Sequence, residues 1–345
     1  MILTVTLNPA LDITYHLEGV EWTGVNRPSQ VRTRPGGKGS NVARTLHALG
    51  ADVLVTGLAG GLTGEAVRSA LRGAGVATSF TVIAGQTRRT VAVVDTRRGT
   101  TALFNEPGPV VAAGEWERFL AAYRSALTGP GRPAADVPEG GAAGRPAAAC
   151  HGRCGAVVLT GSLPPGVPAD SYAVLTGIAA SAGVPVVLDA GGAALRQGAQ
   201  ARPALVTPNL AELESAVGRT LEPQVSVVAP AARELMTAGA QAVVVSLGED
   251  GLVAVTGQDV WHVPPPWLAA GNPVGAGDAV AAGLAHGLVL GRDWPERLRH
   301  AAALGTATAA APAAGEFGRA DFERALAGSR VSRVCPAGRG GAGGR

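Results

Sequence analysis

Cysteine is scarce in this chain, which has only three in 345 residues, Cys150, Cys154 and Cys335. Three cysteines do not make a disulfide framework. The segment Cys150-His151-Gly152-Arg153-Cys154 places two thiols near an imidazole, but no second ligand pair stands at suitable spacing. We therefore expect neither a disulfide scaffold nor a metal site there.

Lysine is scarcer still. Of the 29 basic residues only Lys38 is a lysine, and it lies in the glycine loop Pro35-Gly36-Gly37-Lys38-Gly39. An ammonium group is compact, whereas a guanidinium is a wide planar fork. Lys38 therefore indicates a site where a guanidinium does not fit.

The chain also lacks a run of basic residues interleaved with aromatics, and its net charge is only +3. We therefore do not expect nucleic acid as a partner. The opening segment Met1–Pro9 has no basic residues and breaks at Pro9 after a strand-length apolar run. This pattern predicts neither a signal peptide nor a membrane span, so we expect the protein to work in the cytoplasm.

Apolar residues are plentiful, at 46% of the chain, which is enough for one large α/β domain or two smaller ones. Strand-length apolar runs alternate with helical patterns, and this predicts an α/β fold with a mostly parallel sheet and helices on both faces. Residues 13–34 and 88–104 instead read as strands of a small separate sheet. A further β-rich run at 79–84 is expected to join that small sheet.

Two segments fall outside this alternation. Residues 128–155 are nearly all Gly, Pro, Ala and Arg with no apolar period, which is typical of a flexible insertion. The glycine-rich tail 329–345 is expected to be disordered. The remaining chain, 1–328, is expected to form one domain.

The stretch Gly271–Leu290 places Gly-Asn-Pro-Val-Gly-Ala-Gly-Asp before a long apolar run. Without Cβ atoms at Gly275 and Gly277, successive N–H groups can turn towards one point at a helix start, where the helix dipole also favours an anion. Asp278 lies in the first turn, close enough to act as a base on a group that approaches the anion. The alternative is an ordinary glycine turn with Asp278 as the helix cap.

Two common phosphate motifs do not fit. A Walker loop needs a glycine where Arg32 stands and a serine or threonine where Gly39 stands. In a dinucleotide fingerprint, Val42 or Val280 would occupy the third glycine position. The two glycine loops therefore belong to a rarer class.

The two glycine loops and several further motifs follow one another along the chain. They are Thr6-Leu7-Asn8-Pro9-Ala10-Leu11-Asp12, Val25-Asn26-Arg27, Gly36-Gly37-Lys38-Gly39-Ser40-Asn41-Val42-Ala43-Arg44, Thr87-Arg88, Gly161-Ser162-Leu163-Pro164-Pro165-Gly166, Pro208-Asn209-Leu210-Ala211-Glu212, Ser246-Leu247-Gly248-Glu249-Asp250-Gly251 and Gly275-Ala276-Gly277-Asp278. With them the chain resembles the PfkB-type carbohydrate kinases of the ribokinase superfamily. Within that superfamily it is most similar to the branch of 1-phosphofructokinase, tagatose-6-phosphate kinase and the minor 6-phosphofructokinase.

This resemblance implies ATP-dependent phosphorylation of a hexose phosphate by direct in-line transfer. Asp278 would accept the hydroxyl proton, and the amides of Gly275, Ala276 and Gly277 would stabilise the developing charge. Asp12 and Asn41 would orient the sugar, and Lys38, Arg27 and Arg88 would bind the phosphate already on it. The remaining substrate-binding candidates are Gly36, Gly37, Gly39 and Ser162.

The nucleotide side follows from the same resemblance. Asn209 and Glu212 would organise the ATP phosphates and Mg²⁺ through water, and no side chain is expected to bind the metal directly. Ser246, Gly248 and Gly251 would line the ATP site. The small sheet would be a lid that also pairs two subunits into a homodimer.

Other interpretations stay open for individual residues. Arg88 and Arg89 could be a solvated pair on a hairpin, Asp12 could cap the turn after Pro9, and Ser162 could only shape the Leu-Pro-Pro turn. Asp189, at a strand end, could belong to the Mg²⁺ neighbourhood or cap the following helix.

The sequence departs from the family at two places near the expected nucleotide site. Thr207 replaces a lysine common before Pro-Asn, and Asn272-Pro273 precedes the second glycine turn. These departures leave room for a catalytically weak homologue that binds sugar phosphate or nucleotide as a sensor. The sequence favours fructose 1-phosphate as the acceptor, with tagatose 6-phosphate and fructose 6-phosphate as alternatives.

Overall fold

The computed structural model describes residues 1–128, 153–267, 274–311 and 315–334. The chain divides into two compact units. The first comprises Met1–Ser171 with Ser181–Val184, and the second comprises Tyr172–Ala180 with Pro185–Arg345. The sequence predicted one domain over 1–328, and this stays a prediction.

Four parallel strands form the centre of the first unit, in the order β8-β1-β4-β5. Their sequences are nearly continuous apolar and β-branched runs, and β1, β4 and β8 are buried along their whole length, as parallel strands covered on both faces require. The strands are β1 (Ile2–Thr6), β4 (Val53–Gly60), β5 (Ala77–Ile83) and β8 (Ala156–Thr160); the helices are α1 (Lys38–Ala48), α2 (Gly61–Gly73) and α3 (Ala113–Thr128). The helix α4 (Ser171–Ser181) falls almost entirely in the second unit.

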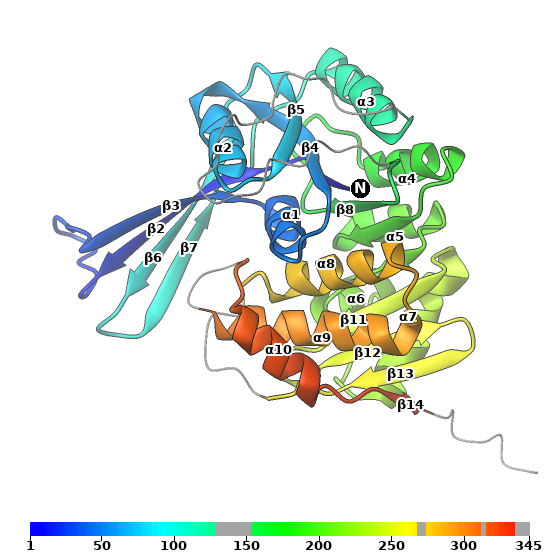
Figure 1. Ribbon diagram of the computed structural model, residues 1–345. Helices are drawn as coiled ribbons and strands as arrows, with labels where there is room; N and C mark the ends of the chain where they lie inside the picture. The colour runs from blue at the N-terminus through cyan, green and yellow to red at the C-terminus, as the bar shows by residue number, and fades with distance from the viewer. Residues whose placement is uncertain (129–152, 268–273, 312–314, 335–345) are drawn as a thin grey trace, which may run out of the picture. The chain divides into compact units, whose positions relative to one another are not determined.

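The small sheet of the first unit has the order β3-β2-β6-β7 and projects from the parallel strands (Figure 1). Its strands are β2 (Ala10–Leu17), β3 (Gln30–Gly36), β6 (Arg88–Asp95) and β7 (Thr100–Asn105). The separate sheet predicted over 13–34 and 88–104 is therefore confirmed. The run at 79–84 was wrongly assigned to it, because β5 pairs in parallel with β4.

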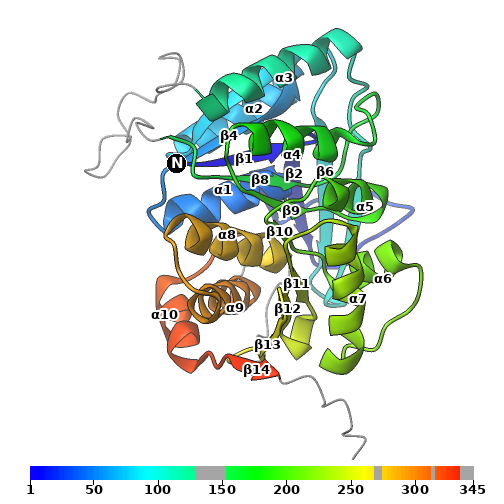
Figure 2. The ribbon, with the colours of Figure 1, turned by 90° about the vertical axis from the view of Figure 1, so that its right-hand side faces the viewer.

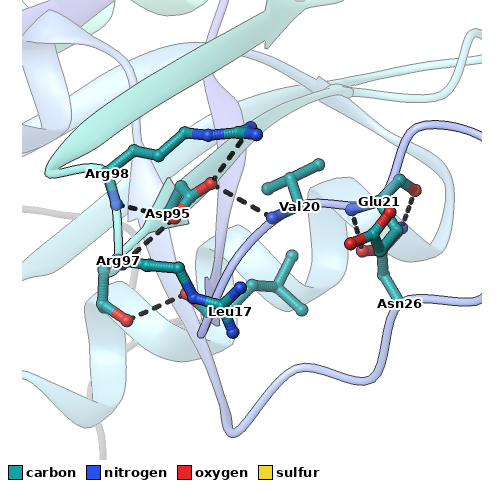
Figure 3. Close-up of polar contacts among 8 residues, drawn as sticks. Leu17, Val20, Glu21, Asn26, Asp95, Arg97 and Arg98 are labelled. Atoms are coloured by element: carbon teal, nitrogen blue, oxygen red, sulfur yellow. Dashed lines mark hydrogen bonds and ion pairs between the residues drawn. The ribbon is translucent and has the colours of Figure 1, made fainter.

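The far end of this sheet is held together by one carboxylate. Asp95, at the end of β6, accepts hydrogen bonds from the backbone N–H groups of Arg97 and Arg98 in the following turn, at 3.1 and 3.0 Å. It also accepts one at 3.1 Å from the N–H of Val20, in the loop between β2 and β3 (Figure 3). Asp95 thus joins the β6–β7 turn to the β2–β3 loop.

The second unit begins with parallel strands and ends with an antiparallel meander, in the order β9-β10-β11-β12-β13-β14. In Figure 2 its helices lie on both sides of these strands, with α8, α9 and α10 on one side and α5, α6 and α7 on the other. The strands are β9 (Val186–Asp189), β10 (Leu205–Val206), β11 (Ala242–Ser246), β12 (Leu252–Thr256), β13 (Asp259–Val263) and β14 (Ser332–Val334). The helices are α5 (Gly192–Gln200), α6 (Leu210–Val217), α7 (Val225–Ala238), α8 (Ala276–Val289), α9 (Trp294–Ala310) and α10 (Arg319–Gly328), and the 3₁₀ turn η2 spans Gly248–Asp250.

The expected boundary of the tail needs one correction. Ser332–Val334, which the sequence placed in a disordered tail from residue 329, forms β14 and pairs with β13, with Val334 opposite Val260. Residues 335–345 of that tail, most of the insertion 128–155, Cys150 and the Asn272-Pro273 pair lie outside the described residues. Within the described ranges, no helix combines the length and the hydropathy that crossing a membrane requires.

Candidate active site

Asp12 lies inside β2 rather than in a turn after Pro9. Its neighbours across the small sheet are Arg34 on β3 and Thr90 on β6. A Cβ atom on Gly36 would lie 2.1 Å from the Asp12 carboxyl carbon, so the glycine leaves room for this carboxylate. Gly36 stays a predicted substrate-binding residue, and the space left by its missing Cβ is filled by the Asp12 carboxylate.

Charge and burial act on Asp12 in opposite directions. Burial raises its pKa above the ordinary value, while a hydrogen bond with Thr90 and the positive charges of Arg88 and Arg44 lower it, and the net shift is upward. Thr90, Arg34 and Arg44 were not among the predicted site residues. Their proximity to Asp12 depends on the strand register and on the position of α1, which the sequence does not display.

Arg88 is half-buried and turned towards this carboxylate. Its Nε donates to the backbone oxygen of Asn8 at 3.2 Å, and its Nη1 donates to the Thr90 hydroxyl at 3.4 Å. Burial lowers the pKa of Arg88, and the charges of Asp12 and Glu106 raise it, with a net lowering. The solvated-pair interpretation therefore does not describe Arg88.

Arg89, the next residue, behaves differently. It is exposed, and its guanidinium forms an ion pair with Glu106 at 2.8 Å. The solvated interpretation therefore fits Arg89. Neighbours in a strand point to opposite faces, which explains why only one of the two arginines faces Asp12.

The glycine loop at 36–39 brings α1 close to β1. Gly37 is the N-cap of α1 with φ of 88°, a conformation that favours glycine. A Cβ on Gly39 would lie 2.7 Å from Cβ of Thr6, so this glycine allows the close approach of helix and strand. Half-buried Lys38 begins the helix, and buried Asn41 lies in its first turn.

Arg27 is not brought together with Lys38 and Arg88. It is exposed in the β2–β3 loop, beyond the last register pair, His16 with Gln30. Asp12 is four residues before His16 on β2, which is roughly 13 Å along the strand. Within the first unit, Arg27 therefore lies at the opposite end of the small sheet from Asp12.

Ser162 follows β8 and is exposed, and its Oγ accepts a hydrogen bond from the side-chain amide of Asn8 at 3.1 Å. Asn8 is 6% exposed and also donates to the backbone oxygen of Pro107 at 3.1 Å. The motif containing Asn8 was noted in the sequence, but this residue was not among the predicted site residues.

In the second unit, Asn209 and Glu212 form a capping box at the start of α6. The Asn209 side chain accepts from the Glu212 N–H at 2.8 Å, and Glu212 accepts from the Asn209 N–H at 2.9 Å. Asn209 also pairs with Ser246 in a parallel bridge, so these three residues meet at the carboxyl ends of β10 and β11. Ligands of open α/β sheets bind at such strand ends.

Gly248 and Gly251, in the turn after β11, have different surroundings. A Cβ on Gly251 would lie 2.1 Å from the backbone oxygen of Val263, so this glycine serves the close approach of β13. Gly248 has a φ of 62°, and a Cβ there would meet nothing within 4 Å. Only Gly248 therefore adjoins open space.

The start of α8 has the features of an anion site. Gly275 is the N-cap, with a left-handed φ of 88° and no side-chain cap. A Cβ on Gly277 would meet nothing within 4 Å, so the space beside this first turn is open. Asp278 is 6% exposed in the same turn and does not cap the helix. The first amides of α8 can thus bind an anion beside a buried carboxylate.

Asp189 and Thr207 lie at neighbouring strand ends. Asp189 ends β9 and is 4% exposed; α5 has Gly191 as its N-cap and no side-chain cap, so the capping role considered for Asp189 is not observed. Thr207 donates its N–H to the oxygen of Leu188 at 2.9 Å, while its buried hydroxyl has no partner among the described residues. No cluster of three or more His, Cys, Asp or Glu suited to a metal ion occurs in the described ranges.

Comparison with known proteins gives one family. A sequence profile of the pfkB family carbohydrate kinases matches residues 5–126 and 153–318. Phosphofructokinase-2 from Escherichia coli, solved with potassium, has a TM-score of 0.82 and 28% identity over 94% of this chain and 98% of that one. The tetrameric inhibited form of the same enzyme has a TM-score of 0.80 at 28% identity, with the same coverage of both chains.

A structure from Thermotoga maritima, described as a possible 1-phosphofructokinase, has a TM-score of 0.81 and 26% identity over 97% of this chain and 99% of that one. These similarities confirm the α/β fold and the family resemblance expected from the motifs. Since the profile covers most of the chain, including both glycine loops, the chain belongs to the pfkB family of carbohydrate kinases, phosphotransferases with an alcohol group as acceptor.

Proposed function

We propose that this kinase transfers the γ-phosphoryl group of ATP to a hydroxyl of a ketose phosphate, with fructose 1-phosphate as the preferred acceptor. The observation that carries the proposal is the start of α8, where open space at Gly277 adjoins the buried carboxylate of Asp278. Similarity to phosphofructokinases supports the choice of a sugar phosphate. Tagatose 6-phosphate and fructose 6-phosphate are the alternative acceptors.

Transfer is direct and needs no covalent enzyme intermediate. The acceptor oxygen attacks the γ-phosphorus, the bond from that phosphorus to the bridging oxygen of ADP breaks, and Asp278 accepts the hydroxyl proton. The amides of Gly275, Ala276 and Gly277 donate to the phosphoryl oxygens, whose charge changes during transfer. Apart from its chain neighbours and the backbone of α8, no described residue comes within 4 Å of a Cβ placed on Gly277, which fits a phosphoryl group there.

The first unit supplies the residues that recognise the sugar phosphate. Asp12 accepts hydrogen bonds from sugar hydroxyls, and Asn41 both donates and accepts. Arg88 and Lys38 bind the existing phosphate. Arg88 suits this role because hydrogen bonds to Asn8 and Thr90 fix its guanidinium in place. We call the small sheet β3-β2-β6-β7 the lid sheet. Arg27 is exposed at the end of this sheet opposite Asp12, and it stays a proposed phosphate-binding residue.

The second unit supplies the residues that hold ATP with Mg²⁺. Asn209, Glu212 and Ser246 adjoin one another at the strand ends, and the unobstructed backbone of Gly248 suits a nucleotide. Gly251 contributes by shaping that turn. Bound Mg²⁺ would neutralise phosphate charge, with Glu212 holding it through water.

We further propose that two copies of the chain pair through the lid sheet. One face of that sheet is largely apolar, and on it Val31 and Phe104 are 54% and 50% exposed. Trp22 and Val25, in the β2–β3 loop, are 73% and 78% exposed. Exposed apolar side chains on one small sheet and its loop are typical of a protein interface.

A coupled ADP-release assay with Mg·ATP tests the function. Fructose 1-phosphate, fructose 6-phosphate, tagatose 6-phosphate and free fructose are compared, and we expect turnover on fructose 1-phosphate with little on free fructose. Turnover on another phosphate ester would correct the substrate but keep the class. If folded protein released no ADP with any acceptor, a sensor would become the better interpretation, and Thr207 would be the first residue to change.

A further inference from the structure

We propose that Asn8 is a positioning residue that fixes the Ser162 hydroxyl as a hydrogen-bond donor, and so favours a phosphorylated sugar over a free one. The proposal rests on the proposed function, because the favoured ligand is the phosphate of its substrate. It is built on the contacts of Asn8 in the first unit.

The orientation of the Asn8 amide is determined by its neighbour. The backbone oxygen of Pro107, 3.1 Å away, can only accept a hydrogen bond, so the atom facing it must be the amide nitrogen. The second hydrogen of that nitrogen goes to Oγ of Ser162, also at 3.1 Å. Both donor hydrogens of Asn8 are therefore used inside the protein.

The surroundings of Asn8 fit the shape of its amide, although its buried Oδ1 has no hydrogen-bond partner among the described residues. The side chain is 6% exposed, and its Oδ1 lies against Gly108, where a Cβ atom would be 2.3 Å from that oxygen. Gly108 has a φ of 99°, so both its conformation and its close approach to Asn8 favour glycine. The amide cannot turn over without setting its oxygen against the oxygen of Pro107.

This arrangement decides the direction of the serine hydroxyl. A hydroxyl has one hydrogen, and Oγ of Ser162 already accepts a hydrogen from Asn8, so its own hydrogen must point elsewhere. Ser162 makes no other hydrogen bond within the described part of the chain, and it is exposed. It therefore presents a donor to a ligand, and phosphate oxygens are pure acceptors.

Asn8 also holds the guanidinium of Arg88 in place. The Nε of Arg88 donates to the backbone oxygen of Asn8 at 3.2 Å. Asn8 thus fixes one neutral donor through its side chain and one cationic donor through its backbone. Only the first of these contacts changes when the side chain is substituted.

The variant Asn8→Asp tests the proposal. A carboxylate of the same shape would accept the hydrogen of Ser162, which would then present lone pairs to the ligand. We expect the dissociation constant for fructose 1-phosphate, measured by titration calorimetry, to rise about tenfold in Asn8→Asp and in Ser162→Ala, which is typical of losing a hydrogen bond to a charged group. Binding of free fructose should change less than about twofold, well under that single-bond loss.

The double variant separates this mechanism from simple charge repulsion. If Asn8 acts through Ser162, then Asn8→Asp adds little in the Ser162→Ala background, whereas repulsion by the new charge would weaken binding equally in both backgrounds. Gln241→Glu is the matched control, since it also replaces an amide that donates to a backbone oxygen, that of Arg202, in the second unit. It should leave binding unchanged.

Three results would contradict the proposed role of Asn8. Additive losses, equal losses for fructose and fructose 1-phosphate, or unchanged binding in Asn8→Asp would overturn the proposal. Should Asn8→Asp not fold, the uncharged Asn8→Leu replaces it, with the same requirement of non-additivity with Ser162→Ala. Wild-type turnover is measured separately, so protein that binds fructose 1-phosphate but releases no ADP would refute the proposed function while the role of Asn8 is still decided.

Discussion

At the scale of single residues, Asp278 decides whether the start of α8 catalyses or only binds. Asp278→Asn keeps the shape of the side chain but removes the proton acceptor, so we expect kcat to fall about a thousandfold, within the usual range for a lost general base. ATP affinity should change little, because the amides that hold the phosphate remain. Single-turnover kinetics and nucleotide titration measure the two effects, and near-wild-type turnover would remove Asp278 from the mechanism.

Gly277 gives a second prediction at this scale, in which stability and activity move in opposite directions. A Cβ there meets nothing within 4 Å, so Gly277→Ala should stabilise α8, by at most the roughly 0.5–1 kcal/mol that alanine gains over glycine inside a helix. We expect kcat to fall at least tenfold, roughly the loss of one charge-stabilising donor, because the methyl group enters the space proposed for the phosphoryl group.

Gly177→Ala in α4 is the matched control for this prediction. It is also a helical glycine whose Cβ would meet nothing within 4 Å, but it has no proposed role in the reaction. It should gain similar stability in chemical denaturation and keep wild-type kcat. Full activity in Gly277→Ala would mean that the reaction does not use this space.

The sequence identified the residue types of the site better than their contacts. Both glycine loops and Asp278 follow from local spacing, which a sequence displays directly. The contact of Gly36 with Asp12 joins two strands, and the link from Asn8 to Ser162 spans 154 positions. Such contacts depend on strand register and on distant segments, so no local pattern predicts them.

At the scale of elements, apolar runs predicted the strands and most helices because burial dictates their composition. The sequence carries no usual start signal for α5, because its N-cap is Gly191 and no side chain caps it. The helix α7 runs from Val225 with Pro230 inside it, although a proline more often marks a helix start or interrupts a helix. Local helix signals were therefore least reliable where tertiary packing overrides them.

The lid sheet gives a prediction at this scale, centred on Asp95. Hydrogen bonds from the backbone, first that of Arg98, lower the pKa of Asp95 below its usual 3.8. In Asp95→Asn the new amide group cannot accept from all three N–H groups, so we expect faster hydrogen exchange at the amides of Val20, Arg97 and Arg98. The exposed carboxylate of Glu323 on α10 offers the control Glu323→Gln, which should leave these amides unchanged.

The pH dependence of this effect follows from the direction of the shift. Because the folded pKa lies below the unfolded one, the carboxylate stabilises the lid fully above pH 3.8, and this stability is lost as the pH falls through the folded pKa. The difference in protection between wild type and Asp95→Asn should therefore be constant at neutral pH and shrink below pH 3.8. A difference that instead grew in acid would contradict the assigned role.

At the scale of the whole molecule, the division into two units sorts the candidate residues by task. Residues proposed to recognise the sugar phosphate all belong to the first unit, and those proposed for ATP and the reacting phosphoryl group belong to the second. The sequence contained both sets of motifs but not this division. The separation lets substitutions in each unit be tested against one ligand at a time.

The proposed homodimer supplies the last prediction. Phe104 lies on the apolar face of the lid sheet and is 50% exposed, whereas its neighbour Leu103, 57% exposed, points to the opposite face. A stable interface buries about 800 Å² on each partner and tolerates a charge poorly at its centre. In sedimentation velocity we therefore expect wild type to be a dimer and Phe104→Asp to dissociate, while Leu103→Asp stays dimeric. Dissociation by Leu103→Asp alone would place the interface on the face that carries Asp12. A monomeric wild type would show that the lid sheet does not pair two subunits.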